Sequence, residues 1–214
     1  MITDAYFFGI INQEYLTGFD ILDLQIDERR VFNMFSDVEL RLKKRRKILF
    51  SAESESLERL SSLISVQNRR TLVMWALDCA GQTLKHFEER YPDEKRPGKC
   101  LEICGAWARG EVKMLVAKRA VLDAHAAARD IEDSEYSALC HAIGHAGATV
   151  HSGKHAIGLP LYELSAIVYR YGKDDFADPV TEKINYYCER LIYWQENADL
   201  HELEWADFLT RDKA

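Results

Sequence analysis

The sequence predicts an all-α protein, an antiparallel or orthogonal multi-helix bundle of roughly eight helices. Three observations lead to this prediction: apolar residues recur at helical spacing over long stretches, strand-like alternation is scarce, and only four prolines interrupt the 214 residues. Apolar residues make up 47% of the chain and charged residues 29%, as in ordinary globular proteins. The length fits one domain, or one domain with an appendage. We expect an N-terminal helical extension of unknown role at residues 1–65 and a helical core with acidic C-terminal helices at residues 66–214.

The beginning of the chain gives the weakest signal. Residues 1–35 show only a short apolar run at residues 6–11 and a loose alternation at residues 19–26. These patterns are compatible with one turn or a short strand, so we expect an irregular segment here.

Two helices are predicted before the core begins. Ser36 and Glu39 have the spacing of a capping box, which predicts a helix from Asp37 through the apolar residues up to Phe50. A second, short helix is expected at residues 51–65, where leucine and isoleucine recur on one face.

A basic run occupies residues 41–47, within the first of these helices. Such a run has two interpretations: a contact with nucleic acid or an acidic partner, or a solvated helix face balanced by acidic residues. Three glutamates follow within residues 53–58, and the whole chain has a formal charge of −7. We therefore favour the solvated face and do not expect nucleic-acid binding.

The helical pattern is strongest from Asn68 onward, and several boundaries have their own signal. Pro97 fits the first turn of a helix, Gly110 suits a left-handed C-cap, and Asp178 before a proline predicts an N-cap. Pro160 indicates a kink or a restart near the beginning of its helix. The expected helices cover residues 68–91, 97–109, 111–129, 136–150, 154–171 and 178–194, and a closing amphipathic segment covers residues 200–209.

The five cysteines, an odd number, cannot form a complete set of disulfides. Cys100 and Cys104 are four residues apart on a predicted helix, which favours core packing over a redox pair. The chain begins without a basic, apolar leader and has no apolar run long enough to cross a bilayer. We therefore expect a cytoplasmic protein with reduced thiols and no membrane contact.

Negative charge is concentrated at the C-terminal end. Residues 173–214 contain 11 acidic and 5 basic residues, whereas residues 66–172 contain 13 acidic and 14 basic residues. This balance is compatible with a basic protein partner, which the acidic tail would attract.

Five of the seven histidines lie within residues 123–158. Four of them form two pairs with a spacing of four residues, so each pair lies on one helix face: His141 with His145, and His151 with His155. One hypothesis is that these four ligate zinc or another divalent metal, with His125 or a carboxylate completing the shell. The other is that the histidines form hydrogen bonds between closely packed, alanine-rich helices. We favour this packed seam and expect no cofactor, because no glutamate follows the first histidine as in a metalloprotease helix.

A second polar group lies near the same helices. Asp78 is placed inside the apolar run at residues 68–91, where a carboxylate requires a basic or histidine partner. His125 and Arg129, four residues apart, either bind an anion or pair with Asp78 or with Glu102. If the region contains a binding site, we expect it at a polar cluster that consists of Asp78, His125, Arg129, His151 and His155.

Other catalytic patterns are not predicted. Cys140 adjoins His141, but neighbours along a helix do not face one another. The serines have no nucleophile-elbow context, and the glycines do not form a phosphate-binding loop.

Several motifs, in order and in register, resemble one known family. They are Met74–Ala80 with Phe87–Asp93, Arg96–Pro97, Ala106–Gly110, Ala124–Arg129, and Gly144–Ala146 through His151 to His155–Ala156. Together they are similar to the immunity-protein-five-like family over residues 68–172. The resemblance implies a small cytoplasmic helical protein that protects a bacterium against a toxin by binding it, and it brings no established catalytic residues.

The sequence therefore predicts a non-enzymatic immunity protein whose partner is a protein toxin. The alternative is a metal-dependent enzyme that uses the histidine cluster between two helices.

Overall fold

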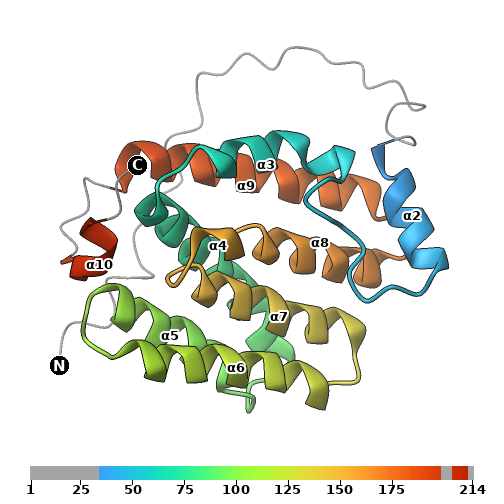
Figure 1. Ribbon diagram of the computed structural model, residues 1–214. Coiled ribbons are helices and arrows are strands. Elements are labelled where there is room, and N and C mark those ends of the chain that lie inside the picture. Colours follow the sequence, from blue (N-terminus) through green and yellow to red (C-terminus); the bar gives the residue numbers. More distant parts are fainter. Residues whose placement is uncertain (1–33, 199–203, 212–214) are drawn as a thin grey trace.

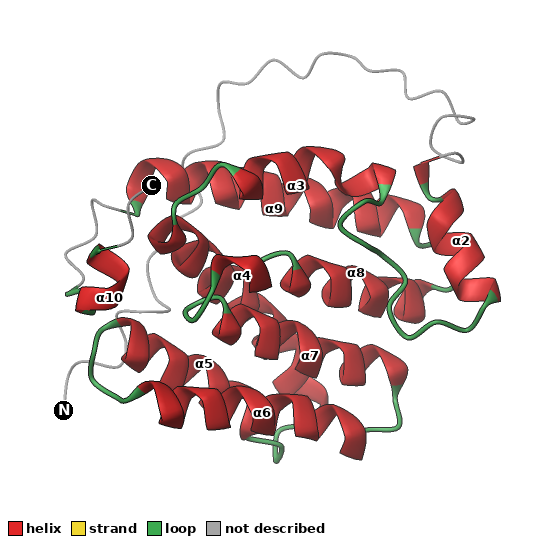
Figure 2. Cartoon of the chain, in the orientation of Figure 1, coloured by secondary structure: helices red, strands yellow, loops and turns green. Residues whose placement is uncertain are grey.

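The computed structural model describes residues 34–198 and 204–211, and within these ranges the chain is built from helices and loops without strands (Figures 1 and 2). The all-α prediction is confirmed. The turn or short strand predicted within residues 1–33 lies outside the described residues, as does part of the closing segment at residues 200–209. The α-helices are α2 (Ser36–Lys43), α3 (Glu58–Ser65), α4 (Arg69–Arg90), α5 (Arg96–Ala108), α6 (Met114–Asp130), α7 (Ser134–Ala148), α8 (Gly158–Tyr171), α9 (Ala177–Asn197) and α10 (Asp207–Thr210), and the 3-10 turns are η1 (Glu55–Leu57) and η2 (Gly153–His155).

The helices are arranged in successive layers, with the α5–α6 hairpin at one edge and α3 with α9 at the other (Figure 1). Helix α7 is central, because it packs against α4, α5, α6 and α8. Helix α4 joins the two ends of the molecule, since it also packs against α9. The histidine region, which spans α6, α7, η2 and the beginning of α8, is therefore held from several sides.

Large aromatic side chains form the centre of the core. Trp75 and Tyr187 are fully buried, with ring centroids 5.5 Å apart, and the Trp75 indole donates to the Tyr187 carbonyl at 3.0 Å. Leu49 and Phe50 are buried in the same hydrophobic cluster, so the described part of residues 1–65 shares its core with the rest of the chain. The division at residue 65 stays a prediction.

Several predicted boundaries are confirmed by their caps. The Asn68 side chain accepts a hydrogen bond from the Thr71 N–H at 2.9 Å and begins α4. The chain leaves α5 through Gly110, whose φ of +82° is a left-handed conformation that glycine adopts without strain. All five cysteines are free and buried, as core packing predicts.

The first predicted helix begins within one residue of the expected position, but its cap and its C-terminal end differ from the prediction. Its N-cap is Phe35, without a side-chain hydrogen bond, so the capping box of Ser36 does not form. The helix ends at Lys43, and Arg45 takes a left-handed φ of +51°. The chain then continues as a loop, in which Leu49 and Phe50 are buried and the Leu49 N–H donates to the Ser165 hydroxyl at 2.9 Å. The apolar residues Leu49 and Phe50 therefore reach the core from a loop and not from a continued helix.

Two later boundaries also differ from the prediction. Helix α9 begins at Ala177 with Phe176 as its N-cap, so Asp178 lies in the first turn instead of capping it. The helix expected at residues 154–171 is divided into η2 and α8, and Pro160 lies in the first turn of α8, where its missing N–H costs nothing.

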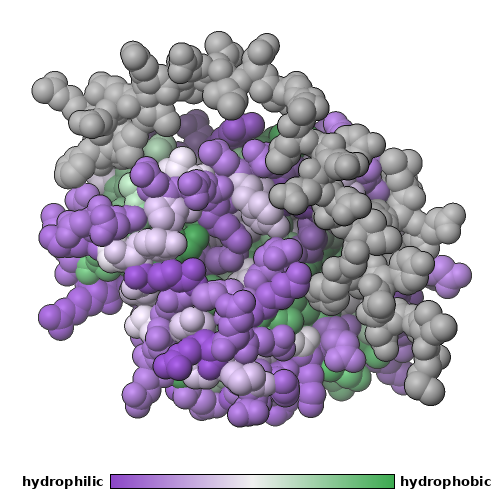
Figure 3. Space-filling view, turned by 180° about the vertical axis from the view of Figure 1, so that it is seen from behind, coloured by the Kyte–Doolittle hydropathy of each residue, from purple (hydrophilic) through white to green (hydrophobic). Residues whose placement is uncertain are grey.

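The surface is mainly hydrophilic, with separate apolar patches on the face that Figure 3 shows. Over the described ranges, four of the eight large apolar side chains that are exposed belong to α6. None of the helices in those ranges has both the length and the apolar character that crossing a membrane requires.

Candidate functional site

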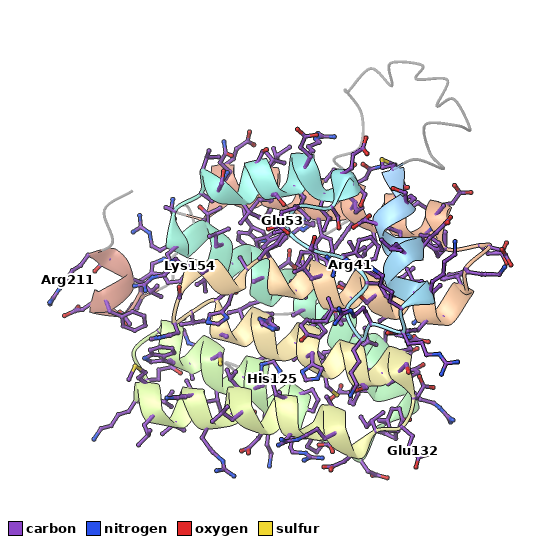
Figure 4. All side chains as sticks on the ribbon, turned by 45° about the vertical axis from the view of Figure 1, so that its right-hand side comes forward. Arg41, Glu53, His125, Glu132, Lys154 and Arg211 are labelled. Carbon is purple, nitrogen blue, oxygen red and sulfur yellow. The ribbon has the colours of Figure 1, made fainter. Side chains whose placement is uncertain are left out.

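Four of the five histidines singled out by the sequence gather in one cluster between helices. His125 projects from α6 into the layer between α6 and α7 (Figure 4), where His141 and His145 come from α7, and His155 comes from η2. The ring centroids are 5.1 Å apart for His125 and His141, 5.3 Å for His125 and His145, and 5.7 Å for His145 and His155. We call these four side chains the histidine cluster.

A single hydrogen bond fixes the protonation of one pair. The Nδ1 atoms of His125 and His141 are 2.8 Å apart, so one nitrogen must carry the proton and the other must accept it. Two charged imidazoles would place a proton on both nitrogens and lose the bond. The geometry therefore requires at least one neutral ring.

Tyr162 of α8 completes the cluster, and sequence reasoning missed it. Its ring lies 4.9 Å from that of His141 and is stacked on that of His145 at 5.2 Å. Its position, four residues after Gly158 at the beginning of α8, could be recognised only once the helix start was known.

Two glycines make room for the rings. A Cβ at Gly144 of α7 would lie 2.7 Å from the His125 ring, and a Cβ at Gly158 of α8 would overlap the His145 ring. Real Cβ atoms do not approach other heavy atoms so closely. The glycines thus explain why α6, α7 and α8 approach each other at this point.

Burial keeps the cluster uncharged at neutral pH. Desolvation, followed by repulsion from neighbouring histidines, lowers the pKa of His125 and of His145 to about 4. The pKa values of His141 and His155 are also lowered, mainly by desolvation; Lys47 and Arg129 add repulsion at His141. The Nδ1 atom of His145 is buried without a hydrogen-bond partner in the described part of the chain, so an added proton would find no acceptor there.

The arrangement does not favour the metal hypothesis. Within the described ranges, no group of three or more histidine, cysteine, aspartate or glutamate side chains has the geometry to hold a metal ion. Of the predicted ligand set, His151 stacks on Trp107, with ring centroids 6.1 Å apart, instead of joining the cluster, although its charge helps to lower the pKa of His155. The Nδ1 of His141 is engaged with His125 rather than free for a ligand.

The residues of the predicted polar cluster do not lie together. Asp78 accepts hydrogen bonds from Arg190 at 2.8 Å and from the Trp194 indole at 2.8 Å, both on α9. Asp78 thus has a basic partner, as predicted, but that partner is Arg190 rather than His125 or Arg129. His125 belongs to the histidine cluster, and Arg129 is exposed at the end of α6.

A different feature, a groove between α5 and α6, was not predicted. It holds about 390 Å³ and is lined by Arg96, Lys99, Ile103, Leu115, Val116, Arg119, Ala120 and Asp123. Leu115, which points into this groove from α6, is 74% exposed. A signal was present: residues 114–116 are all apolar, and three consecutive helical residues cannot all face one core.

The comparisons with known proteins identify the family. The family model described as Imm-5 like putative immunity protein matches residues 62–191, more than half of the chain. This match reaches from α3 into α9 and so includes both the histidine cluster and the groove. Comparisons with curated proteins and with solved structures found no match. This chain therefore belongs to the family of Imm-5 like putative immunity proteins.

Proposed function

We propose that this protein is an immunity protein that binds a protein toxin and neutralises it by occlusion, without catalysis. The family match over residues 62–191 is the observation that carries the proposal. A bacterium that makes such a toxin needs the protecting protein where the toxin is made, so the proposal includes the cytoplasmic location.

The fold supports binding rather than a large conformational change. The central helix α7 is fixed by α4, α5, α6 and α8, and its close approach to α5 and α6 depends on glycines. A rigid helical surface loses little conformational entropy when a partner docks, and this favours affinity. The acidic residues of 173–214 would speed the encounter with any basic part of the toxin.

The test uses the product of the gene next to the one that encodes this chain. We expect the two purified proteins to form a complex in size-exclusion chromatography, and we expect coexpression of this chain to restore growth of cells that produce the neighbouring protein. An unrelated helical protein of similar size and charge serves as the control. If this chain neither binds the neighbouring product nor restores growth, the proposed function is wrong.

A further inference from the structure

We propose that the groove between α5 and α6 is a docking surface for an acidic, apolar segment of a protein partner. Under the proposed function that partner is the toxin, so the inference rests on that function and adds to it the surface and the chemistry of the contact. The two helices form the outer edge of the bundle (Figure 1).

Four apolar side chains of α6 are exposed to solvent, where they add nothing to the stability of the helix. Leu115 is 74% exposed and Leu122 is 53% exposed, and the exposed fractions of Met114 and Val116 are 51% and 48%. Contiguous exposed apolar residues with a polar rim mark interaction sites. A partner that covers these leucine and methionine side chains would remove them from water, and this burial would favour binding.

The apolar area is larger than the groove. Leu115 and Val116 line it together with Ile103 of α5, whereas Met114 and Leu122 lie on the same helix outside the lining. A small ligand inside the groove would leave those two side chains in water. A macromolecular segment that follows α6 would cover all of them, as in the recognition of an amphipathic helix in a groove.

Basic side chains surround this apolar area. Lys99 is exposed and forms no ion pair with any residue that the structure describes. The Arg119 side chain is 77% exposed, and within residues 34–198 and 204–211 it pairs only with Asp123, one turn away on the same helix, at 3.0 Å. Exposed pairs of this kind contribute little, so Arg119 can exchange Asp123 for a carboxylate of a partner.

The local charge is opposite to that of the whole chain. Residues 95–123, which include α5 and most of α6, contain seven basic and three acidic residues, whereas the chain as a whole carries −7. The overall charge predicts a basic partner, but the segment that enters this groove must be acidic at the positions that face Lys99 and Arg119. The two expectations concern different parts of the toxin.

The same charges favour a protein over the other anionic macromolecules. An anionic membrane would repel a chain of net charge −7, and nucleic acid binds basic surfaces through its phosphates without needing an apolar floor. A protein segment can place carboxylates at the rim and apolar side chains over Leu115 and Val116.

The first experiment tests the chemistry without the toxin. The probe is an amphipathic peptide of leucine and glutamate, about 15 residues long so that it can form a helix, and a leucine–lysine peptide of the same pattern is the control. We expect the glutamate peptide to bind the full-length chain in fluorescence anisotropy, and its affinity to fall as salt screens the rim charges. Leu115→Ser and Lys99→Glu should each weaken this binding by about tenfold or more.

Matched variants distinguish the groove from the general surface. Val66 of the described chain is 76% exposed, like Leu115, and Lys173 has a side chain that is 74% exposed, yet neither lines the groove. Val66→Ser and Lys173→Glu should leave binding of the glutamate peptide unchanged. Any binding of the lysine peptide, which the acidic chain attracts, should not respond to Leu115→Ser.

The second experiment repeats these four substitutions in the complex with the toxin. Weakening of about tenfold by the two groove substitutions, with normal binding of the two controls, supports the inference. If the wild-type chain does not bind the toxin, the proposed function fails; if it binds and the groove variants bind equally well, only the docking surface is wrong. The inference is also overturned if the glutamate peptide does not bind, if the chain instead binds phosphatidylglycerol vesicles through Leu115, or if Leu115→Ser abolishes a dimer of this chain.

Discussion

At the scale of single residues, the histidine cluster depends on glycines, which have no side chain to occupy the space between the helices. Gly144 and Gly158 leave the space that the rings of His125 and His145 occupy, and Gly147 does the same for two cysteines of α5. Overpacking a well-filled interface forces side chains from their rotamers and shifts the backbone. A methyl group added at these positions therefore tests whether the cluster is as closely packed as the structure shows.

We expect Gly144→Ala to lower the free energy of unfolding by about 1–2 kcal/mol, because the new Cβ would lie 2.7 Å from the His125 ring. Gly105→Ala is the matched control, since Gly105 is also in the interior of a helix but its Cβ would have, among the described side chains, only that of Arg109 nearby, at 3.5 Å. That substitution should stabilise the protein by about 0.5–1 kcal/mol through helix propensity. Chemical denaturation measures both, and equal effects of the two substitutions would contradict the packing argument.

At the scale of helices, polar contacts connect elements that are far apart in the sequence. Asp78 of α4 binds Arg190 and Trp194 of α9, and the Arg190 guanidinium lies 4.4 Å from the centroid of the Tyr193 ring. The side chain of Asp78 is 22% exposed and that of Arg190 is 14% exposed. A pair removed from water to this extent is costly to break, because the remaining charge stays buried.

We expect Asp78→Ala to destabilise the protein by about 2–3 kcal/mol, less than for a fully buried pair because some water reaches the carboxylate. Asp174→Ala removes the carboxylate of an exposed pair with Lys173 and should change stability by less than about 0.5 kcal/mol. A double-mutant cycle with Arg190→Met measures the coupling. Additive effects of the two substitutions would show that the observed pair does not hold α4 against α9.

The helices that the sequence predicted correctly are those with a long apolar period and a local cap, such as α4 with Asn68. The prediction failed where burial did not require a helix, as for Leu49 and Phe50, which reach the core from a loop. It also failed for contacts that only tertiary packing decides. The spacing of His151 and His155 suggested one shared site, but η2 turns the chain there, so that His155 joins the cluster and His151 stacks on Trp107.

At the scale of the whole molecule, the histidine cluster makes stability depend on pH. The pKa values of His125 and His145 are about 4 in the folded protein, whereas a histidine in the unfolded chain has a pKa of about 6.5. Between these pH values the two histidines bind protons in the unfolded chain but remain neutral in the folded protein. The two neutral rings therefore make their full contribution to the free energy of unfolding above about pH 6.5. This contribution decreases as the pH is lowered through this window and does not decrease further below about pH 4.

We expect the free energy of unfolding to decrease by on the order of 2 kcal/mol between about pH 7 and pH 5 for the two rings together, a figure reduced for the water that reaches part of each ring. Carboxylates with lowered pKa values, such as Glu94, lose their contribution only at lower pH, so this interval isolates the histidines.

The measurement is urea denaturation at several pH values. The slope should largely disappear in the double variant His125→Gln, His145→Gln and persist in His151→Gln, because His151 lies outside the cluster. A wild-type stability that is level over this interval would show that the rings accept protons as readily in the folded protein as in the unfolded chain, and that the packing between α6, α7 and α8 does not keep them neutral.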